Sequence, residues 1–259
     1  MLDYTNVSFE IHPDRNRMGA AAARLFQQRV EEAVAAKSRC RVVFGCAPSQ
    51  GEFFQHLVAE ARANPGVWER VEVFHMDEYV GLPADHPQSF RTYLRRHFLD
   101  HVKTARFHLI PGEASPAKAE AKRYAAMLAE APIDVVGMGI GENGHVAFND
   151  PSAADFQDPL LAKVVKLETA CRQQQVNDGC FPDLASVPRS AITVTVPVFA
   201  RAGSLICIVP GPRKARAVRR AMFDPIGPQC PATILRLHPR ARLFLDPDAA
   251  ALVPPAQAT

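Results

Sequence analysis

Residues 71–83 read VEVFHMDEYVGLP, and this stretch joins a buried strand to two adjacent acidic side chains. Its first six residues form a largely apolar run, which is typical of a strand in a parallel sheet covered on both faces. Asp77 and Glu78 come directly after this run, and the chain then turns at Gly81 and Pro83. Because carboxylates are costly to bury at the end of such a strand, the pair needs an explanation in terms of function or of structural hydrogen bonds.

Strand-like and helix-like segments alternate along the whole chain. The expected strands are residues 41–47, 71–76, 133–139, 191–197, 204–211 and 241–246. The expected helices are residues 17–37, 50–63, 89–102, 117–131 and 213–222. Alternation of this kind predicts an α/β fold, a parallel sheet with helices on both faces. No repeat, low-complexity tract or Gly/Ser linker divides the chain, so residues 1–259 are expected to form a single α/β domain.

Composition narrows the functional classes. The 259 residues are 47% hydrophobic and 22% charged, which is globular, and the net charge of +3 is too mild to predict a nucleic-acid partner. That balance suits a small anionic substrate. The six cysteines include no C-x-x-C pair, which favours reduced thiols in a cytoplasmic protein. The N-terminus lacks the pattern of a secretory signal and no apolar run approaches the roughly 20 residues of a membrane span, so no membrane contact is expected.

The three loops after residues 41–47, 71–76 and 133–139 should lie together, because ligands of parallel α/β folds bind at the carboxyl ends of the strands. The third loop, residues 137–151, reads GMGIGENGHVAFNDP. Its glycines, among them Gly144, permit close approach of the backbone to a ligand. The glycines lead to a histidine and AFNDP rather than into a helix, so a dinucleotide-binding loop is not favoured.

His145 and Asp77 are the candidate acid–base residues. His145 lies in this loop among polar side chains that include Asn143 and Asp150, a setting that favours proton transfer over a purely structural histidine. Side chains alternate along a strand, so Asp77 and Glu78 should point in opposite directions. One carboxylate can then face the cleft as a general base, while the other accepts structural hydrogen bonds.

Two further segments are candidate anion sites. Ser49 follows the first expected strand, in GCAPSQGEF, where backbone N–H groups at a helix start can hold an anion, although an ordinary turn explains the pattern equally well. Lys214 lies in the first turn of the expected helix 213–222, where the helix dipole disfavours a cation, and this placement suggests an anion nearby. His97 and His101 are four residues apart, but without an H-E-x-x-H pattern they indicate a solvated helix face rather than a metal site.

Taken together, these segments resemble the glucosamine-6-phosphate deaminase family, also called glucosamine-6-phosphate isomerase. The segments MDEYVGLPADHPQSF and GIGENGHVAFNDP are similar to its two most specific motifs, and VPRSAITVTV, VPGPRKARAV and CPATILRLHP follow in the family's order and spacing. The resemblance covers nearly the whole chain. The related 6-phosphogluconolactonases share the fold but lack these forms of the first two motifs.

The resemblance implies a Rossmann-like parallel sheet, shared with ribose-5-phosphate isomerase. It also implies conversion of glucosamine 6-phosphate and water to fructose 6-phosphate and ammonia, without a cofactor or a metal. It assigns to Asp77 the base that moves a proton between C2 and C1, and to His145 the opening of the sugar ring. Lys214 matches a phosphate-binding lysine, Asp150 stands where the family has glutamate, and Glu78 belongs to the support of the base.

Several departures mark the chain as a divergent member of this family. Asn143 stands where the family has aspartate, and it can hydrogen-bond the imidazole of His145 but supplies no full charge. The family's phosphate-binding arginine has no counterpart at its place, and Arg172 is the nearest candidate to replace it. APSQGEF replaces the usual T-G-x-T-P loop.

The sequence leaves three functions open. They are a deaminase acting on an amino-sugar phosphate, a related sugar-phosphate isomerase or lactonase, and a non-catalytic sugar-phosphate sensor. Retention of Asp77 and His145 favours catalysis over sensing. The oligomeric state is also open, with a homo-oligomer among the alternatives.

Overall fold

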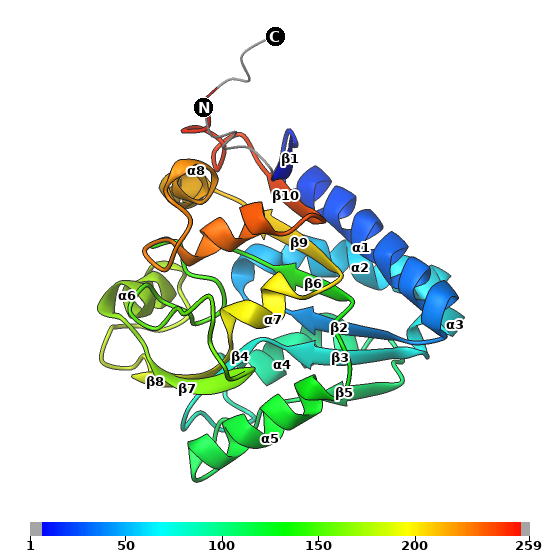
Figure 1. Ribbon diagram of the computed structural model, residues 1–259, viewed down its shortest axis with the longest axis horizontal. Coiled ribbons are helices and arrows are strands. Elements are labelled where there is room, and N and C mark those ends of the chain that lie inside the picture. The colour runs from blue at the N-terminus through cyan, green and yellow to red at the C-terminus, as the bar shows by residue number, and fades with distance from the viewer. Residues whose placement is uncertain (1–6, 255–259) are drawn as a thin grey trace.

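The computed structural model describes residues 7–254, and its centre is a seven-stranded sheet in which all neighbouring strands run parallel (Figure 1). In spatial order its strands are β1 (Ser8–Ile11), β10 (Ala241–Leu245), β9 (Ser204–Val209), β6 (Val135–Met138), β2 (Cys40–Phe44), β3 (Val71–His75) and β5 (Arg106–His108). The predicted α/β fold with a parallel sheet is confirmed. Strands β6, β2 and β3 are direct neighbours, so the loops that follow them leave the same edge of the sheet.

Helices cover both faces of this sheet, as predicted. Successive residues of each strand point to opposite sides, so the apolar strands present side chains to be buried on both faces. Val42 and Phe44 of β2 pack on one face and Val43 packs on the other. The first face is covered by α1 (Arg15–Lys37), α2 (Gly51–Ala63) and α3 (Pro65–Trp68). The second face is covered by α5 (Ala117–Ala129), α7 (Val196–Ala200), α8 (Ala215–Phe223) and the 3-10 helix η4 (Pro231–Leu237).

A second sheet of three antiparallel strands lies beside the first and is not expected from the sequence. Its strands, in spatial order, are β4 (Asp77–Tyr79), β8 (Ser190–Val194) and β7 (Ala162–Lys166). The expectation that residues 191–197 belong to the parallel sheet is wrong, because β8 pairs with β4 and β7 and the chain turns into α7 at Val196.

Met76 is the residue at which the chain passes from one sheet to the other. Its N–H donates to the carbonyl of Phe44 in β2 at 3.0 Å, and its carbonyl accepts from the N–H of Val194 in β8 at 2.8 Å. Strand β3 therefore ends at His75, and β4 begins only two residues later at Asp77. This crossing places the start of β4 at the carboxyl edge of the parallel sheet.

The expected helix 89–102 is irregular. It consists of α4 (Phe90–Leu94) followed by a π-helical turn, Arg95–Leu99. His97 and His101 are exposed, and His101 Nε2 donates to the carbonyl of Arg96 at 2.8 Å. The prediction of a solvated helix face is confirmed. Between residues 7 and 254, no helix is both long enough and apolar enough to cross a membrane.

Helices α1 and α2 touch at Gly19, and this contact generates a stability prediction. A Cβ at Gly19 would lie 2.8 Å from the backbone carbon of Glu52 in α2. Gly19→Ala should therefore force the helices apart and lower the free energy of unfolding by about 1–3 kcal/mol, despite the better helix propensity of alanine. Urea unfolding monitored by circular dichroism measures the change.

Gly51→Ala is the matched control, because Gly51 is the first residue of α2 and a Cβ there would meet no heavy atom within 4 Å. This variant should be unchanged or more stable, by up to about 1 kcal/mol. Equal effects of the two substitutions would show that the Gly19 contact does not limit how closely the helices pack.

Candidate active site

The loops after β2, β3 and β6 line one cavity at the carboxyl edge of the parallel sheet, as the sequence predicts. The cavity has a volume of about 70 Å³, and Asp77, His145 and Lys214 are in its wall. Ser49, in the 3-10 helix η1 (Pro48–Gln50), lines it as well. Ser49 and Lys214 also line a neighbouring pocket of about 350 Å³. Four of the predicted site residues are thus brought together around two hollows that share Ser49 and Lys214.

The Asp77 carboxylate faces this cavity without a hydrogen-bond partner. Asp77 is only 6% exposed, and within residues 7–254 no donor hydrogen-bonds to its side chain. Burial, and then the adjacent Glu78 carboxylate, raise the pKa of Asp77 well above its ordinary value. A desolvated carboxylate with a raised pKa in a cavity wall is the arrangement expected of a general base.

Glu78 supports the start of α4 from inside the protein. Its carboxylate accepts hydrogen bonds from Ser89 Oγ at 2.7 Å, from the Arg91 N–H at 3.0 Å and from the Tyr79 N–H at 3.0 Å. The guanidinium of Arg91 lies 3.4 Å from the same carboxylate. The prediction that one carboxylate faces the cleft while the other accepts structural hydrogen bonds is confirmed, with Asp77 as the free one.

Glycines shape the loop that carries His145. The Gly141 N–H donates to the carbonyl of His145 at 2.9 Å, and a side chain at Gly141 would overlap the imidazole. Gly144 has a φ of +92°, and a Cβ there would lie 2.7 Å from Cys230 Sγ. The structure places Gly144 against Cys230 rather than in the cavity wall, so its observed contribution is to the loop and not to a ligand contact.

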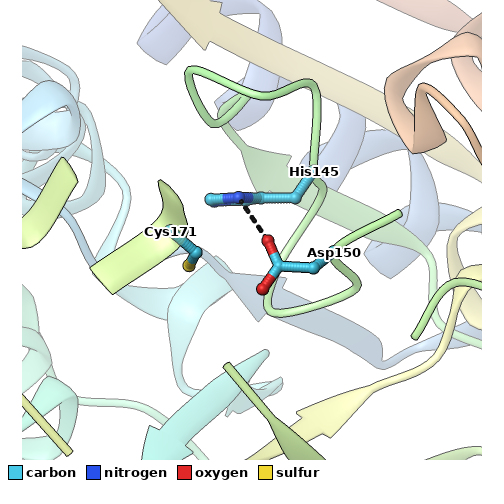
Figure 2. A group of neighbouring side chains, drawn as sticks. All are labelled: His145, Asp150 and Cys171. Atoms are coloured by element: carbon cyan, nitrogen blue, oxygen red, sulfur yellow. Dashed lines mark ion pairs between the residues drawn. The ribbon is translucent and has the colours of Figure 1, made fainter. Parts of the chain in front are cut away.

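His145 and Asp150 lie in contact beside the cavity (Figure 2). Nδ1 of His145 lies 3.2 Å from Oδ1 of Asp150, and Asp150 Oδ2 accepts a hydrogen bond from the Glu168 N–H at 3.0 Å. Burial acts to raise the pKa of Asp150, but the contacts with His145, the Asn143 amide and the Glu168 N–H together outweigh it, and the pKa lies below its ordinary value. The ionised carboxylate can therefore orient the imidazole and stabilise its protonated form.

Asn143 lies beside Asp150 and not beside the imidazole. Its Nδ2 donates to Asp150 Oδ1 at 2.9 Å, and its Oδ1 accepts from the backbone N–H of His145 at 3.0 Å. The expectation that Asn143 hydrogen-bonds the imidazole is therefore wrong, because its side chain bridges two other groups of its own loop. A neutral amide suits this place, since it donates to the carboxylate without adding a second negative charge.

Lys214 is a buried lysine without a side-chain partner in the described part of the chain. It ends the 3-10 turn η3 (Pro212–Lys214) just before α8 and is 7% exposed. Among the described residues, no acceptor hydrogen-bonds or ion-pairs with its ammonium. Burial lowers the pKa of Lys214, although Asp178 and Glu142 in its surroundings act in the opposite direction. An unpaired, buried ammonium between the two hollows can hold a phosphate.

Arg172 does not reach the cavity. It lies on α6 (Thr169–Asn177), and its guanidinium donates to the carbonyl of Val187 at 2.9 Å and to the carbonyl of Leu184. These bonds anchor the loop that leads to β8. The expectation that Arg172 replaces the family's phosphate-binding arginine is not supported by this placement, because the guanidinium is already engaged by backbone carbonyls.

Helix α6 also supplies two cavity residues that the motifs do not single out, Gln174 and Gln175. Gln174 Oε1 accepts a hydrogen bond from the Glu142 N–H at 2.8 Å, which ties α6 to the His145 loop. The Gln175 amide is largely buried and makes no hydrogen bond within residues 7–254. The run of three glutamines at 173–175 is the signal in the sequence that points to them.

Comparison with known proteins identifies relatives over most of the chain. The family described as glucosamine-6-phosphate isomerases/6-phosphogluconolactonase matches residues 13–244. A glucosamine-6-phosphate deaminase of Shouchella clausii is 32% identical over 238 residues, which are 91% of this chain and 93% of that protein. A glucosamine-6-phosphate deaminase of Exiguobacterium sibiricum is 37% identical over 185 residues, 71% of each chain.

Comparison of the structure with solved structures points to the same kind of protein. A solved structure of a monomeric glucosamine-6-phosphate deaminase matches with a TM-score of 0.86 at 25% identity, covering 95% of this chain and 100% of that one. The resemblance seen in the motifs is thus confirmed over most of the sequence and in three dimensions. The chain belongs to the glucosamine-6-phosphate isomerase/6-phosphogluconolactonase family.

Proposed function

We propose that the chain is a glucosamine-6-phosphate deaminase, which converts glucosamine 6-phosphate and water to fructose 6-phosphate and ammonia. One observation carries the proposal: the same cavity is lined by the imidazole of His145 and by the Asp77 carboxylate and Lys214 ammonium, which have no partner among residues 7–254. The reaction needs a base for a carbon acid, a proton carrier for the ring oxygen and a cation for the phosphate. The names of the curated relatives agree with this assignment.

In the proposed reaction, the phosphate binds Lys214 beside Ser49, where the cavity meets the neighbouring pocket. His145, oriented by Asp150, moves the proton of the anomeric hydroxyl to the ring oxygen, and the sugar opens to its aldehyde form. Asp77 then removes the C2 proton and returns a proton to C1, which converts the aminoaldehyde to an imine at C2. Water adds to this imine and ammonia leaves, giving fructose 6-phosphate.

Burial suits Asp77 to its role as the base. A carboxylate in water is a weak base for a C–H bond, and the raised pKa of Asp77 makes it a stronger one once it is ionised. Glu78 cannot share this role, because Ser89 and backbone N–H groups of α4 occupy its oxygens. The roles of the two adjacent carboxylates are therefore separated by their surroundings.

A substrate panel tests the proposed function. Hexosamine 6-phosphates, hexose 6-phosphates and 6-phosphogluconolactone are each incubated with the protein, and ammonia, ketose and acid are measured. Glucosamine 6-phosphate should release ammonia and fructose 6-phosphate in equal amounts. Lactone hydrolysis without ammonia release would make the chain a lactonase, and binding without any turnover would make it a sensor.

Asp77→Asn should abolish turnover and stabilise the fold at neutral pH. The rate should fall by about 10²–10⁴, because an amide cannot accept the C2 proton. The pKa of Asp77 is raised in the folded protein, so its ionised form destabilises the fold from the ordinary carboxyl pKa of about 3.9 upward. The variant lacks this penalty, so its melting temperature should exceed that of the wild type at neutral pH, and the difference should shrink as the pH is lowered.

Steady-state kinetics and thermal unfolding across pH measure both effects. Asp85→Asn is the control, because Asp85 is exposed in the next loop and makes no hydrogen bond or ion pair among the described residues. It should leave the rate and the melting temperature unchanged. Turnover by Asp77→Asn at the wild-type rate would remove Asp77 from the mechanism.

Lys214→Met should raise the KM for the phosphorylated sugar about 10–100-fold and change kcat little. A charge-assisted contact to the phosphate is made equally in the ground state and the transition state, so its loss weakens binding uniformly. Lys118→Met, at an exposed lysine of α5, is the control for the loss of a positive charge. An unchanged KM in Lys214→Met would mean that the phosphate binds elsewhere.

A further inference from the structure

His145, Asp150 and Cys171 form a cluster whose ligating atoms all lie within 4.8 Å of one another (Figure 2). All three residues are buried, and they come from the His145 loop and from helix α6. The proposed deaminase reaction uses His145 and Asp150 but gives Cys171 no role. We propose that this His–Asp–Cys cluster binds Zn²⁺, and that the bound ion inhibits the enzyme.

The separation of the two loop residues fits a tetrahedral metal ion. Zinc binds imidazole nitrogen and carboxylate oxygen at about 2.0–2.2 Å and thiolate sulfur at about 2.3 Å. Two such nitrogen and oxygen ligands on adjacent tetrahedral corners lie roughly 3.3 Å apart, and His145 Nδ1 lies 3.2 Å from Asp150 Oδ1. Cys171 Sγ lies within 4.8 Å of one imidazole nitrogen of His145 and of one carboxylate oxygen of Asp150, so a side-chain shift of roughly 1 Å brings the sulfur to a ligand position.

The ligand atoms are available and oriented. His145 Nδ1 is buried and, within residues 7–254, makes no aligned hydrogen bond, although it lies close to Asp150. The Asn143 side chain and the Glu168 N–H each hold one oxygen of the Asp150 carboxylate. Outer hydrogen bonds of this kind orient metal-binding carboxylates in other proteins. Because the Asn143 amide only donates to Asp150, the carboxylate oxygens keep lone pairs that can bind an ion.

Cys171 determines which cation the cluster selects. Its side chain is 1% exposed, in the first turn of α6, and the thiol releases its proton to solvent as the sulfur–metal bond forms. One imidazole, one carboxylate and one thiolate suit Zn²⁺, whereas Mg²⁺ and Ca²⁺ prefer oxygen ligands. His145 also lines the cavity, so a water molecule from the cavity can supply the fourth ligand.

Metal binding and the proposed reaction compete for the same atoms. A cation on Nδ1 replaces the contact between His145 and Asp150 and neutralises the carboxylate that stabilises the protonated imidazole. Ring opening should then stop, and a chelator should restore it because no atom is chemically altered. The claim that bound Zn²⁺ inhibits the enzyme, the inhibitory half of the inference, rests on the proposed function. The claim that the cluster binds Zn²⁺ does not.

Titration of the full chain with Co²⁺, under reducing conditions and with Zn²⁺ as competitor, tests the binding. A thiolate ligand gives Co²⁺ a charge-transfer absorption, and tetrahedral coordination gives it intense visible bands. The wild type should show both, and Zn²⁺ should remove them. Cys171→Ala should lose the charge-transfer absorption and bind Co²⁺ at least about tenfold more weakly. Cys180→Ala, which changes the half-buried cysteine after the same helix, should behave as the wild type.

Circular dichroism and melting temperatures of the metal-free variants check the fold, and Cys171→Ser replaces Cys171→Ala if the alanine variant does not fold. Co²⁺ binding without a thiolate absorption, or equal binding by the wild type and the Cys171 variants, overturns the proposal. If the wild type deaminates glucosamine 6-phosphate, Zn²⁺ that binds without inhibiting overturns the inhibitory half. If it does not, thiolate-dependent binding still supports the metal site, and only the proposed function fails.

Discussion

Met76 hydrogen-bonds to both sheets, and the position of the chemistry follows from this link. Its N–H donates to Phe44 of the parallel sheet, and its carbonyl accepts from Val194 of the antiparallel sheet. The strand therefore leaves the parallel sheet one residue before Asp77, and side chains that alternate along β4 separate Asp77 from Glu78. One strand crossing thus gives the cavity a free carboxylate and gives α4 a buried carboxylate at its start.

The protein compensates buried charges that support the fold and leaves others uncompensated in the cavity. Arg41 in β2 is buried, and its Nε lies 2.7 Å from a carboxylate oxygen of Glu72. Asp77 and Lys214 have no such partner within residues 7–254, and burial raises the pKa of the first and lowers that of the second. Both shifts favour the neutral forms. A sugar phosphate provides an anion for the lysine and an acidic C–H bond for the carboxylate. The cost of burying these two unpaired groups is therefore concentrated at the place where they serve function.

The parallel sheet can be predicted from the sequence because buried central strands leave a local mark, an apolar run that ends at a polar loop. The antiparallel sheet cannot, since β8 reads like any buried strand and its pairing with β4 is a long-range contact. Helix α6 leaves no periodic signal because the few apolar residues of TACRQQQVN form no stripe along one face. In the site, residue type and loop position are sufficient to predict that Asp77, His145 and Lys214 line the cavity. The contacts of Asn143 and Arg172 cannot be predicted in this way, because they depend on the direction of each side chain. Both side chains hydrogen-bond to groups that no motif specifies.

The most direct test of the proposed chemistry follows the proton at C2. Glucosamine 6-phosphate deuterated at C2 is converted in ordinary water under single-turnover conditions, and the label is located by mass spectrometry and NMR. If Asp77 moves the proton between C2 and C1, deuterium leaves C2 as fast as ketose forms and is recovered at C1 of fructose 6-phosphate or in the solvent. Asp77→Asn should release this deuterium and form ketose at only a small fraction of the wild-type rate. Release of deuterium from C2 at the wild-type rate in this variant would contradict the role of Asp77 as the base, and with it the assignment of the cavity.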